Sequence, residues 1–203
     1  MQLIGMLDSP YVRRVAISLK CLEIPFEHQA ISVFGGFERF QAINPVVKAP
    51  TLVCDNGEVL MDSGLILEYL AALAGPERSL MPASLADKVQ ALKLIGLALA
   101  ASEKSVQIVY EQKLRPADKQ HGPWLERVRG QLEAAYGALE QELAHRPLAT
   151  DGTLDQAGIS VAVAWDFSKR VLGQQLAVSR YPQLETYSRY AESLPVFIGT
   201  PTN

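Results

Sequence analysis

Strand signals in this 203-residue chain are concentrated before residue 62, and helical patterns fill almost everything after that point. The short apolar or alternating runs that are typical of strands nearly all lie in the first part. Two of them flank Asn56-Gly57, the strongest short signal for a β-hairpin. A chain with this pattern is expected to form a small α/β domain followed by an all-α domain.

The first part has the predicted order β-α-β-(α)-β-β-α. Ser9 precedes Pro10 at the start of a helix, where a serine can accept a hydrogen bond from a free N–H group and proline suits the first position. Ser63 is predicted to cap the last helix of this part, which Gly75-Pro76 ends. The expected elements are strands 2–6, 26–31, 51–54 and 59–61, helices 11–22 and 63–73, and an irregular segment 34–44 with one helical turn.

The second part is expected to contain four helices. The third of them is apolar on most sides, which predicts a helix buried in a core. The helices are expected at 85–114, 124–145, 154–172 and from 182 to about 194. We therefore predict an α/β domain over residues 1–75, a linker over 76–84 and an all-α domain over 85–203.

Composition excludes several classes of function. The 19 basic and 22 acidic residues give a net charge of -3, without the basic excess that binding to nucleic acid needs. Cys21 and Cys54 match no metal-binding spacing, and two thiols in such a chain indicate a reducing compartment. No signal peptide or apolar run of about 20 residues is visible. We expect a soluble, cytoplasmic protein without a metal, nucleic acid or membrane partner.

Three segments carry residues suited to binding a ligand. Ser9 precedes a helix N-terminus, where N–H groups favour an anion, although it could simply cap the helix. A cis bond before Pro50 would leave the backbone of Ala49 able to pair with an extended ligand, whereas a trans bond would make a plain turn into a strand. Asp62 could pair with an ammonium group and the N–H groups near Ser63 with a carboxylate, unless both only cap a helix.

In their order and spacing these segments resemble the cytosolic glutathione transferase superfamily, over essentially the whole chain. The first part is similar to its thioredoxin-like domain and the rest to its all-helical domain. Residues 9–13, Ser-Pro-Tyr-Val-Arg, resemble the active-site segment of small bacterial members of the serine type. Residues 44–52 resemble the loop with the cis-proline, and Asp62-Ser63 resembles the pair that holds the γ-glutamyl group.

The resemblance implies a role for each residue. Ser9 would donate a hydrogen bond to the glutathione sulfur. Glutathione would be bound by Lys48 at its glycine carboxylate, by Ala49 and cis-Pro50 at its cysteinyl part, and by Asp62 and Ser63 at its γ-glutamyl group. A small electrophile would lie against Tyr11 and Tyr110, although both aromatic side chains could equally be packing residues. The resemblance also implies a homodimer.

The resemblance predicts an enzyme that joins the glutathione thiolate to a small electrophile or carries out a related glutathione-dependent reaction, with glutathione as co-substrate and no metal. The alternative is a non-catalytic member of the fold that acts through protein contacts. A thioredoxin-like redox protein is disfavoured because Ser9 stands where such a protein has a cysteine. In the family, the buried helix begins with a capping box. Here Thr153 and Gln156 are expected to fill it, and Gly158 would allow another helix to come close.

Overall fold

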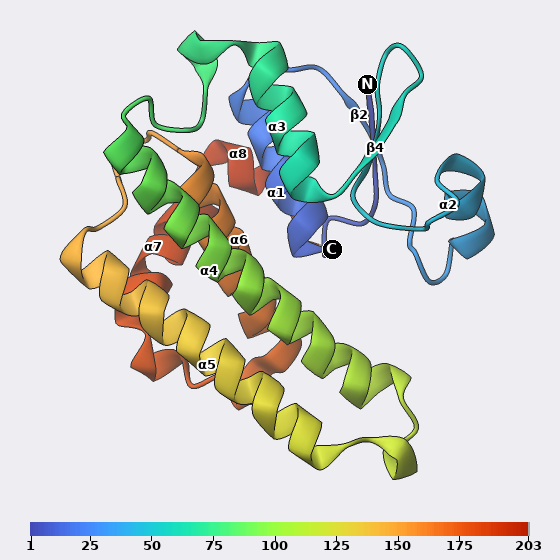
Figure 1. Ribbon diagram of the computed structural model, residues 1–203, viewed down its shortest axis with the longest axis vertical. Coiled ribbons are helices and arrows are strands. Elements are labelled where there is room, and N and C mark those ends of the chain that lie inside the picture. The colour runs from blue at the N-terminus through green and yellow to red at the C-terminus, as the bar shows by residue number, and fades with distance from the viewer. Residues whose placement is uncertain (203) are drawn as a thin grey trace. The chain divides into compact units, whose positions relative to one another are not determined.

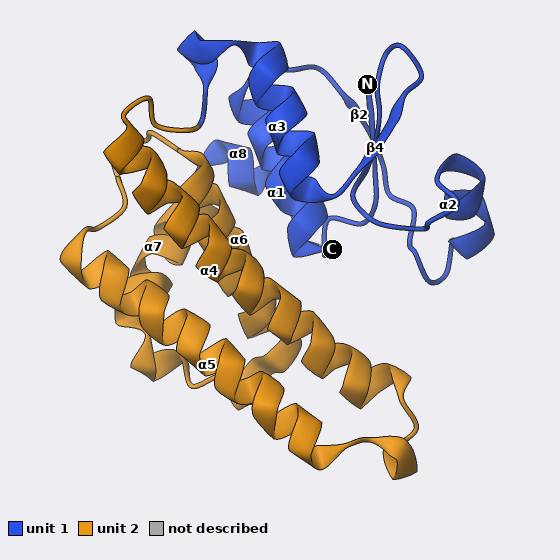
Figure 2. Ribbon diagram, viewed as in Figure 1, with its two compact units in different colours: residues 1–80, 194–203 blue, residues 81–193 orange. Residues whose placement is uncertain are grey.

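The computed structural model describes residues 1–202 and divides the chain into two compact units (Figure 2). Unit 1 consists of residues 1–80 together with the end of the chain from residue 194. Unit 2 consists of residues 81–193. Unit 1 contains a mixed sheet with helices, and unit 2 is entirely helical, so the predicted fold class, a thioredoxin-like part followed by a helical part, is confirmed.

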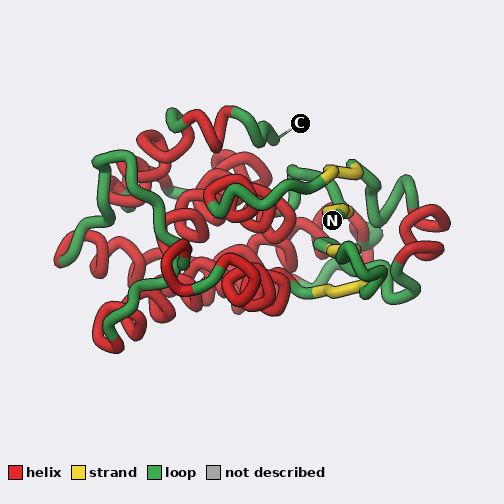
Figure 3. The backbone as a smooth tube through the Cα atoms, turned by 90° about the horizontal axis from the view of Figure 1, so that it is seen from above, coloured by secondary structure: helices red, strands yellow, loops and turns green. Residues whose placement is uncertain are grey.

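The strands of unit 1 are short (Figure 3). They form a four-stranded sheet in the order β2-β1-β3-β4. Strand β1 is parallel to β2 and antiparallel to β3, and β3 is antiparallel to β4. The hairpin predicted at Asn56-Gly57 is the connection between β3 and β4. The strands are β1 (Gln2–Ile4), β2 (Glu27–Gln29), β3 (Thr51–Val53) and β4 (Val59–Met61).

Neighbouring side chains of β1 bury opposite faces of this sheet. Leu3 packs with helices α1 (Pro10–Cys21) and α3 (Ser63–Ala74), which lie side by side (Figure 1). Ile4 packs instead with Phe40 of helix α2 (Phe37–Ile43). The segment expected to be irregular therefore contains a complete short helix, because its one fully buried residue, Phe40, anchors it to the sheet.

Unit 2 is built from four longer helices joined by the segments 110–121, 146–155 and 173–181. These are α4 (Leu85–Val109), α5 (Gly122–His145), α6 (Gln156–Leu172) and α7 (Pro182–Glu192). Helix α6 packs against both α4 and α7, and its first ten residues are all buried, as its apolar sequence predicted. Every helix in the described part of the chain is too short or too polar to span a lipid bilayer.

Two details of unit 2 differ from the sequence-based expectations. The helix predicted over 85–114 changes at its end into a π-helical turn, η2 (Tyr110–Leu114). Helix α6 is capped by Asp155, whose Oδ1 accepts the N–H of Gly158 at 2.7 Å, so the capping box predicted from Thr153 was wrong. Thr153 instead donates its hydroxyl proton to Asp151. The ionised Asp155 carboxylate is the stronger acceptor for an N-terminal N–H group.

Gly158 marks a close approach of two helices, as the sequence predicted. A Cβ atom at this position would lie 2.1 Å from Oη of Tyr187 in α7. Only a residue without a side chain therefore lets α7 pack here.

The end of the chain packs against α1 in unit 1, although the sequence analysis assigned it to the helical part. Arg13 donates from Nε to the carbonyl oxygen of Thr200 at 2.9 Å, and its guanidinium carbon lies 5.5 Å from the ring centre of Phe197. Phe197, in the short helix α8 (Pro195–Ile198), is fully buried. A buried arginine and a buried aromatic ring hold this segment on α1.

Candidate functional site

Two of the three segments singled out from the sequence, the start of α1 and the loop of Ala49, come together at the end of β1. Gly5 follows this strand with φ +136°, and a Cβ atom there would lie 2.6 Å from Cγ2 of Val12 and 3.1 Å from Cβ of Ala49. The absence of a side chain at Gly5 therefore lets the first turn of α1 and the loop of Ala49 come together. Beside them, the carbonyl oxygen of Gly5 lies 2.8 Å from Nε2 of His28 in β2.

Ser9 is the N-cap residue of α1. The N–H of Val12 donates to its Oγ at 3.4 Å, and Pro10 is the first helical residue, as the sequence predicted. The Ser9 hydroxyl is the acceptor in this bond, and within residues 1–202 no acceptor takes its proton. The hydroxyl can therefore still donate to an anion placed at the positive end of α1.

The loop before β3 is fixed by a chain of hydrogen bonds. Asn44, which is buried, donates from Nδ2 to Oγ1 of Thr51 at 2.8 Å, and Thr51 donates to the carbonyl oxygen of Lys48 at 2.7 Å. The bond between Ala49 and Pro50 is cis, which confirms the prediction. In the described part of the chain, neither backbone group of Ala49 has a hydrogen-bond partner.

Asp62, rather than Ser63, is the N-cap residue of α3, so the predicted cap was wrong. Asp62 has φ 73°, and its Oδ1 accepts the N–H of Gly64 at 2.8 Å. Aspartate tolerates this left-handed region better than most residues, and its side chain then reaches the helix N-terminus. Ser63 becomes the first residue of the helix and is buried.

Arg14 is the residue that the sequence analysis missed. Its guanidinium donates from Nη1 to Oγ of Ser63 at 3.1 Å, while its buried Nε has no partner among residues 1–202. Desolvation lowers the pKa of Arg14 to about 10, against the opposing influence of Asp62 and Tyr11, so the side chain is still a cation at neutral pH. The sequence held only a weak signal for this role. Arg13 and Arg14 are adjacent in a helix whose other inward-facing positions are apolar.

Lys48 and Asp62 lie near each other at the surface. Lys48 Nζ is 3.9 Å from Asp62 Oδ2, and each side chain is 52% exposed. An exposed pair at this distance contributes little to stability. This distance nevertheless shows that the loop of Ala49 and the start of α3 are adjacent.

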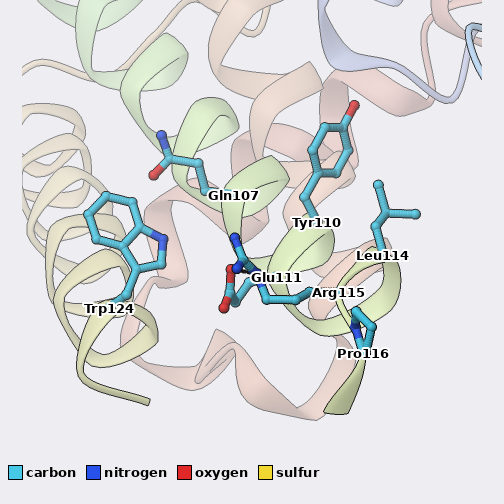
Figure 4. Close-up of a pocket in the computed structure, with 7 residues that line it drawn as sticks. All are labelled: Gln107, Tyr110, Glu111, Leu114, Arg115, Pro116 and Trp124. Carbon is cyan, nitrogen blue, oxygen red and sulfur yellow. Dashed lines mark ion pairs between the residues drawn. The ribbon is translucent and has the colours of Figure 1, made fainter. Parts of the chain in front are cut away.

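The two aromatic residues expected at an electrophile site belong to different units. Tyr11 is half-buried in the first turn of α1 in unit 1. Tyr110 begins the π-helical turn in unit 2 and lines a hollow there together with Trp124 (Figure 4). Within residues 1–202, no group of three or more histidine, cysteine, aspartate or glutamate side chains is arranged to hold a metal.

Comparison with known proteins identifies the family. The profile described as "Glutathione S-transferase, N-terminal domain" matches residues 3–78, which contain all three motif segments. The uncharacterized GST-like protein YibF of Escherichia coli (strain K12) is 31% identical over 164 residues, 81% of this chain and 80% of that protein. The chain belongs to the glutathione S-transferase family.

Solved structures of glutathione transferases agree with this assignment. A glutathione transferase family member from Pseudomonas fluorescens Pf-5, with bound glutathione, matches with a TM-score of 0.85 and 28% identity, over 100% of this chain and 98% of that one. The same protein with bound S-(propanoic acid)-glutathione matches with the same TM-score over 99% of its chain. The chain therefore has the fold of the glutathione transferases, as the resemblance predicted.

Proposed function

We propose that this chain binds glutathione in unit 1 and joins its thiolate to a small electrophile. One observation carries the proposal: contacts within a single unit link all three motif segments. Val12 and Ala49 meet at Gly5, Lys48 approaches Asp62, and Arg14 binds Ser63. The glutathione-bound relatives from Pseudomonas fluorescens support glutathione as the co-substrate.

Ser9 would stabilise the thiolate. A free thiol titrates near 8.5, and only the thiolate is the nucleophile. A hydroxyl donor and the positive end of α1 both favour the charged sulfur, so they lower the pKa of the bound thiol. The Ser9 hydroxyl already accepts the N–H of Val12, and its remaining proton is therefore the one offered to sulfur.

Ser63, Arg14 and Asp62 would hold the γ-glutamyl group. Because Arg14 donates to Oγ of Ser63, the serine hydroxyl proton is directed away from the arginine and can be donated to a carboxylate. The buried guanidinium adds positive charge beneath that carboxylate. Asp62 accepts the N–H of Gly64 through Oδ1, which leaves Oδ2 near the surface for the ammonium group.

Ala49 and Lys48 would hold the rest of glutathione. The N–H and C=O of Ala49, which have no partner among residues 1–202, can bond the cysteinyl backbone as an added strand would. Lys48 would reach the glycine carboxylate by giving up its loose contact with Asp62. Tyr11, in the first turn of α1, would contact the electrophile.

The protein would act as a homodimer in a reducing, cytoplasmic environment. Both cysteines, Cys21 and Cys54, are free thiols. Each unit also carries large apolar side chains that its own core leaves exposed, as expected of a surface that a second copy covers. These are Leu65 and Leu73 in unit 1, and Leu85, Val89 and Leu92 in unit 2.

The test has two stages. Isothermal titration with glutathione examines binding, and a panel of aryl halides, enals, epoxides and peroxides then examines turnover. We expect saturable binding and turnover of at least one class of electrophile. Binding without turnover on the whole panel would favour a non-catalytic protein, and the absence of binding would refute the proposal.

A further inference from the structure

The imidazole of His28 binds the backbone at the point where β1 ends. Its Nε2 lies 2.8 Å from the carbonyl oxygen of Gly5, the residue directly after the strand. A carbonyl oxygen can only accept a hydrogen bond, so Nε2 carries a proton and donates it. This contact ties β2 to the backbone that leaves β1 toward the start of α1.

Gly5 is the residue whose backbone most needs such a constraint. A side chain there would collide with Val12, and the backbone has φ +136°. Only glycine therefore fits, but glycine also leaves the backbone free to rotate. The N–H of Gly5 is fixed by the sheet, because it donates to the carbonyl oxygen of Gln29 at 3.1 Å. The orientation of its carbonyl group is fixed by His28.

The carbonyl oxygen of Gly5 depends on the histidine for its hydrogen bond. Gly5 is buried, and in the part of the chain that the structure describes no backbone N–H donates to this oxygen. Buried carbonyl groups are nearly always paired, because an unpaired one costs free energy. Without the imidazole, this peptide group would stay unpaired or rotate toward another donor.

The peptide group that His28 holds begins the turn leading to Ser9. The N–H of Ser9 donates to the carbonyl oxygen of Met6 at 3.1 Å, so the next peptide along the turn is bonded to Ser9 itself. Peptide groups are planar, so few torsion angles separate the group held by His28 from Ser9. A rotation at Gly5 would therefore displace Ser9 relative to Ala49, which lies beside Gly5.

We propose that His28 is a positioning residue for the thiolate site. By holding the carbonyl group of Gly5, it fixes where the Ser9 hydroxyl lies relative to a sulfur bound beside Ala49. The inference rests on the glutathione site proposed above, and it assigns His28 no contact with glutathione. Hydrogen bonds weaken steeply as their geometry departs from the optimum, so a displaced Ser9 stabilises the thiolate less.

Replacing the imidazole by a ring without a donor tests this role. His28→Phe should raise the pKa of bound glutathione by about half to one unit, a loss of thiolate at neutral pH of about three- to tenfold. Thiolate absorbance at saturating glutathione measures the shift. His28→Gln can place an amide N–H near the position of Nε2, so it should restore most of the wild-type pKa. An unchanged pKa in His28→Phe would overturn the proposal.

A double variant shows whether His28 acts through Ser9. In the Ser9→Ala background, adding His28→Phe should not shift the thiol pKa further, because the donor that His28 positions is already absent. Additive shifts in the double variant would contradict the proposal, since His28 would then affect the thiol by another route.

Two control variants separate positioning from a general loss of stability. His145 makes the same kind of contact, with Nδ1 2.7 Å from the carbonyl oxygen of Gln141, but it lies at the end of α5 in unit 2. His145→Phe should leave the thiol pKa unchanged. Gly158→Ala, which introduces a clash within unit 2, should lower stability and also leave the thiol pKa unchanged. A pKa shift in either control as large as that in His28→Phe would mean that the shift reports stability alone.

A measurement on the wild type keeps the proposal testable if His28→Phe does not fold. Nitrogen-15 spectra of the imidazole should show the proton of His28 on Nε2, and a neutral ring with its proton on Nδ1 would refute the contact. If the wild type binds glutathione and His28→Phe titrates as the wild type does, only the positioning role fails. If the wild type binds no glutathione, the proposed function fails, and the positioning role fails with it.

Discussion

Arg14 donates a hydrogen bond to the hydroxyl oxygen of Ser63 at 3.1 Å and thereby joins α1 to the first residue of α3. The arginine is buried, and its Nε has no partner within residues 1–202. Asp62 offsets only part of the desolvation of this buried cation, so an anion bound at the start of α3 would stabilise it further. This relationship gives the most specific test of the proposed γ-glutamyl site.

Arg14→Met should weaken glutathione binding by about tenfold or more, because a charged hydrogen-bonding partner is lost. Arg14→Lys should retain part of the affinity. Isothermal titration with glutathione measures both. Arg13→Met is the matched control: Arg13 is also buried in α1 but bonds Thr200, so its loss should lower stability and leave glutathione affinity unchanged. Equal affinity in Arg14→Met and the wild type would remove Arg14 from the site.

Ser9→Ala should raise the pKa of bound glutathione. Losing a hydrogen bond to a charged group costs roughly 1.5–3 kcal/mol, which corresponds to about one to two pKa units. Turnover near neutral pH should fall roughly tenfold to hundredfold and partly recover as pH rises, because the unassisted thiol then ionises. Thiolate absorbance at saturating glutathione measures the shift. If Ser9 only caps α1, the two titration curves will superimpose and stability will drop by about 1 kcal/mol.

Gly158→Ala should destabilise unit 2. The added Cβ would lie 2.1 Å from Oη of Tyr187, and such overpacking costs about 1–3 kcal/mol. Removing that oxygen in the double variant Gly158→Ala with Tyr187→Phe should recover much of the loss. Urea denaturation followed by circular dichroism measures the free energy of unfolding.

Gly137→Ala in α5 provides the control for that substitution. Apart from the nearby backbone of α5 itself, nothing in the described part of the chain lies within 4 Å of a Cβ built there, so alanine should stabilise the helix by about 0.5–1 kcal/mol. A gain of stability in Gly158→Ala as well would mean that Tyr187 moves aside without cost.

The protein should be a dimer in solution. Light scattering at micromolar concentration should give twice the 22.2 kDa mass of the chain. Replacing Leu65 and Val89 by glutamate should shift the mass toward the monomer, because charged side chains oppose burial of these faces. A wild-type mass near that of one chain would contradict the prediction.

The sequence predicted the elements in which apolar residues follow a clear periodicity or turn residues mark the ends. The hairpin at Asn56-Gly57 and the buried helix after Asp155 were both evident, because turn chemistry and apolar periodicity act over short distances. The strand expected over 2–6 ends earlier, at Ile4, since Gly5 adopts a positive φ where α1 and the loop of Ala49 come together.

Other features depend on distant contacts, and local sequence could not show them. Asp62 caps α3 only because the backbone there adopts a left-handed conformation. Arg14 and Ser63 are 49 positions apart in the sequence, and no local pattern predicts a hydrogen bond between them. The resemblance to glutathione transferases named Ser9, Ala49 and Asp62 because it depends on short motifs, but it did not name the side chain beneath them.

The return of the chain's end to α1 also sets an order of assembly. Unit 1 contains both the first 80 residues and the segment from residue 194 onward, so unit 2 is an insertion within it. During synthesis, Arg13 is made near the start, but its partner Thr200 leaves the ribosome only after the whole of unit 2 has been translated. The helical insertion can therefore fold while α1 of the nascent chain still lacks its contacts with the segment from residue 194 onward, which joins unit 1 only after unit 2 has been made.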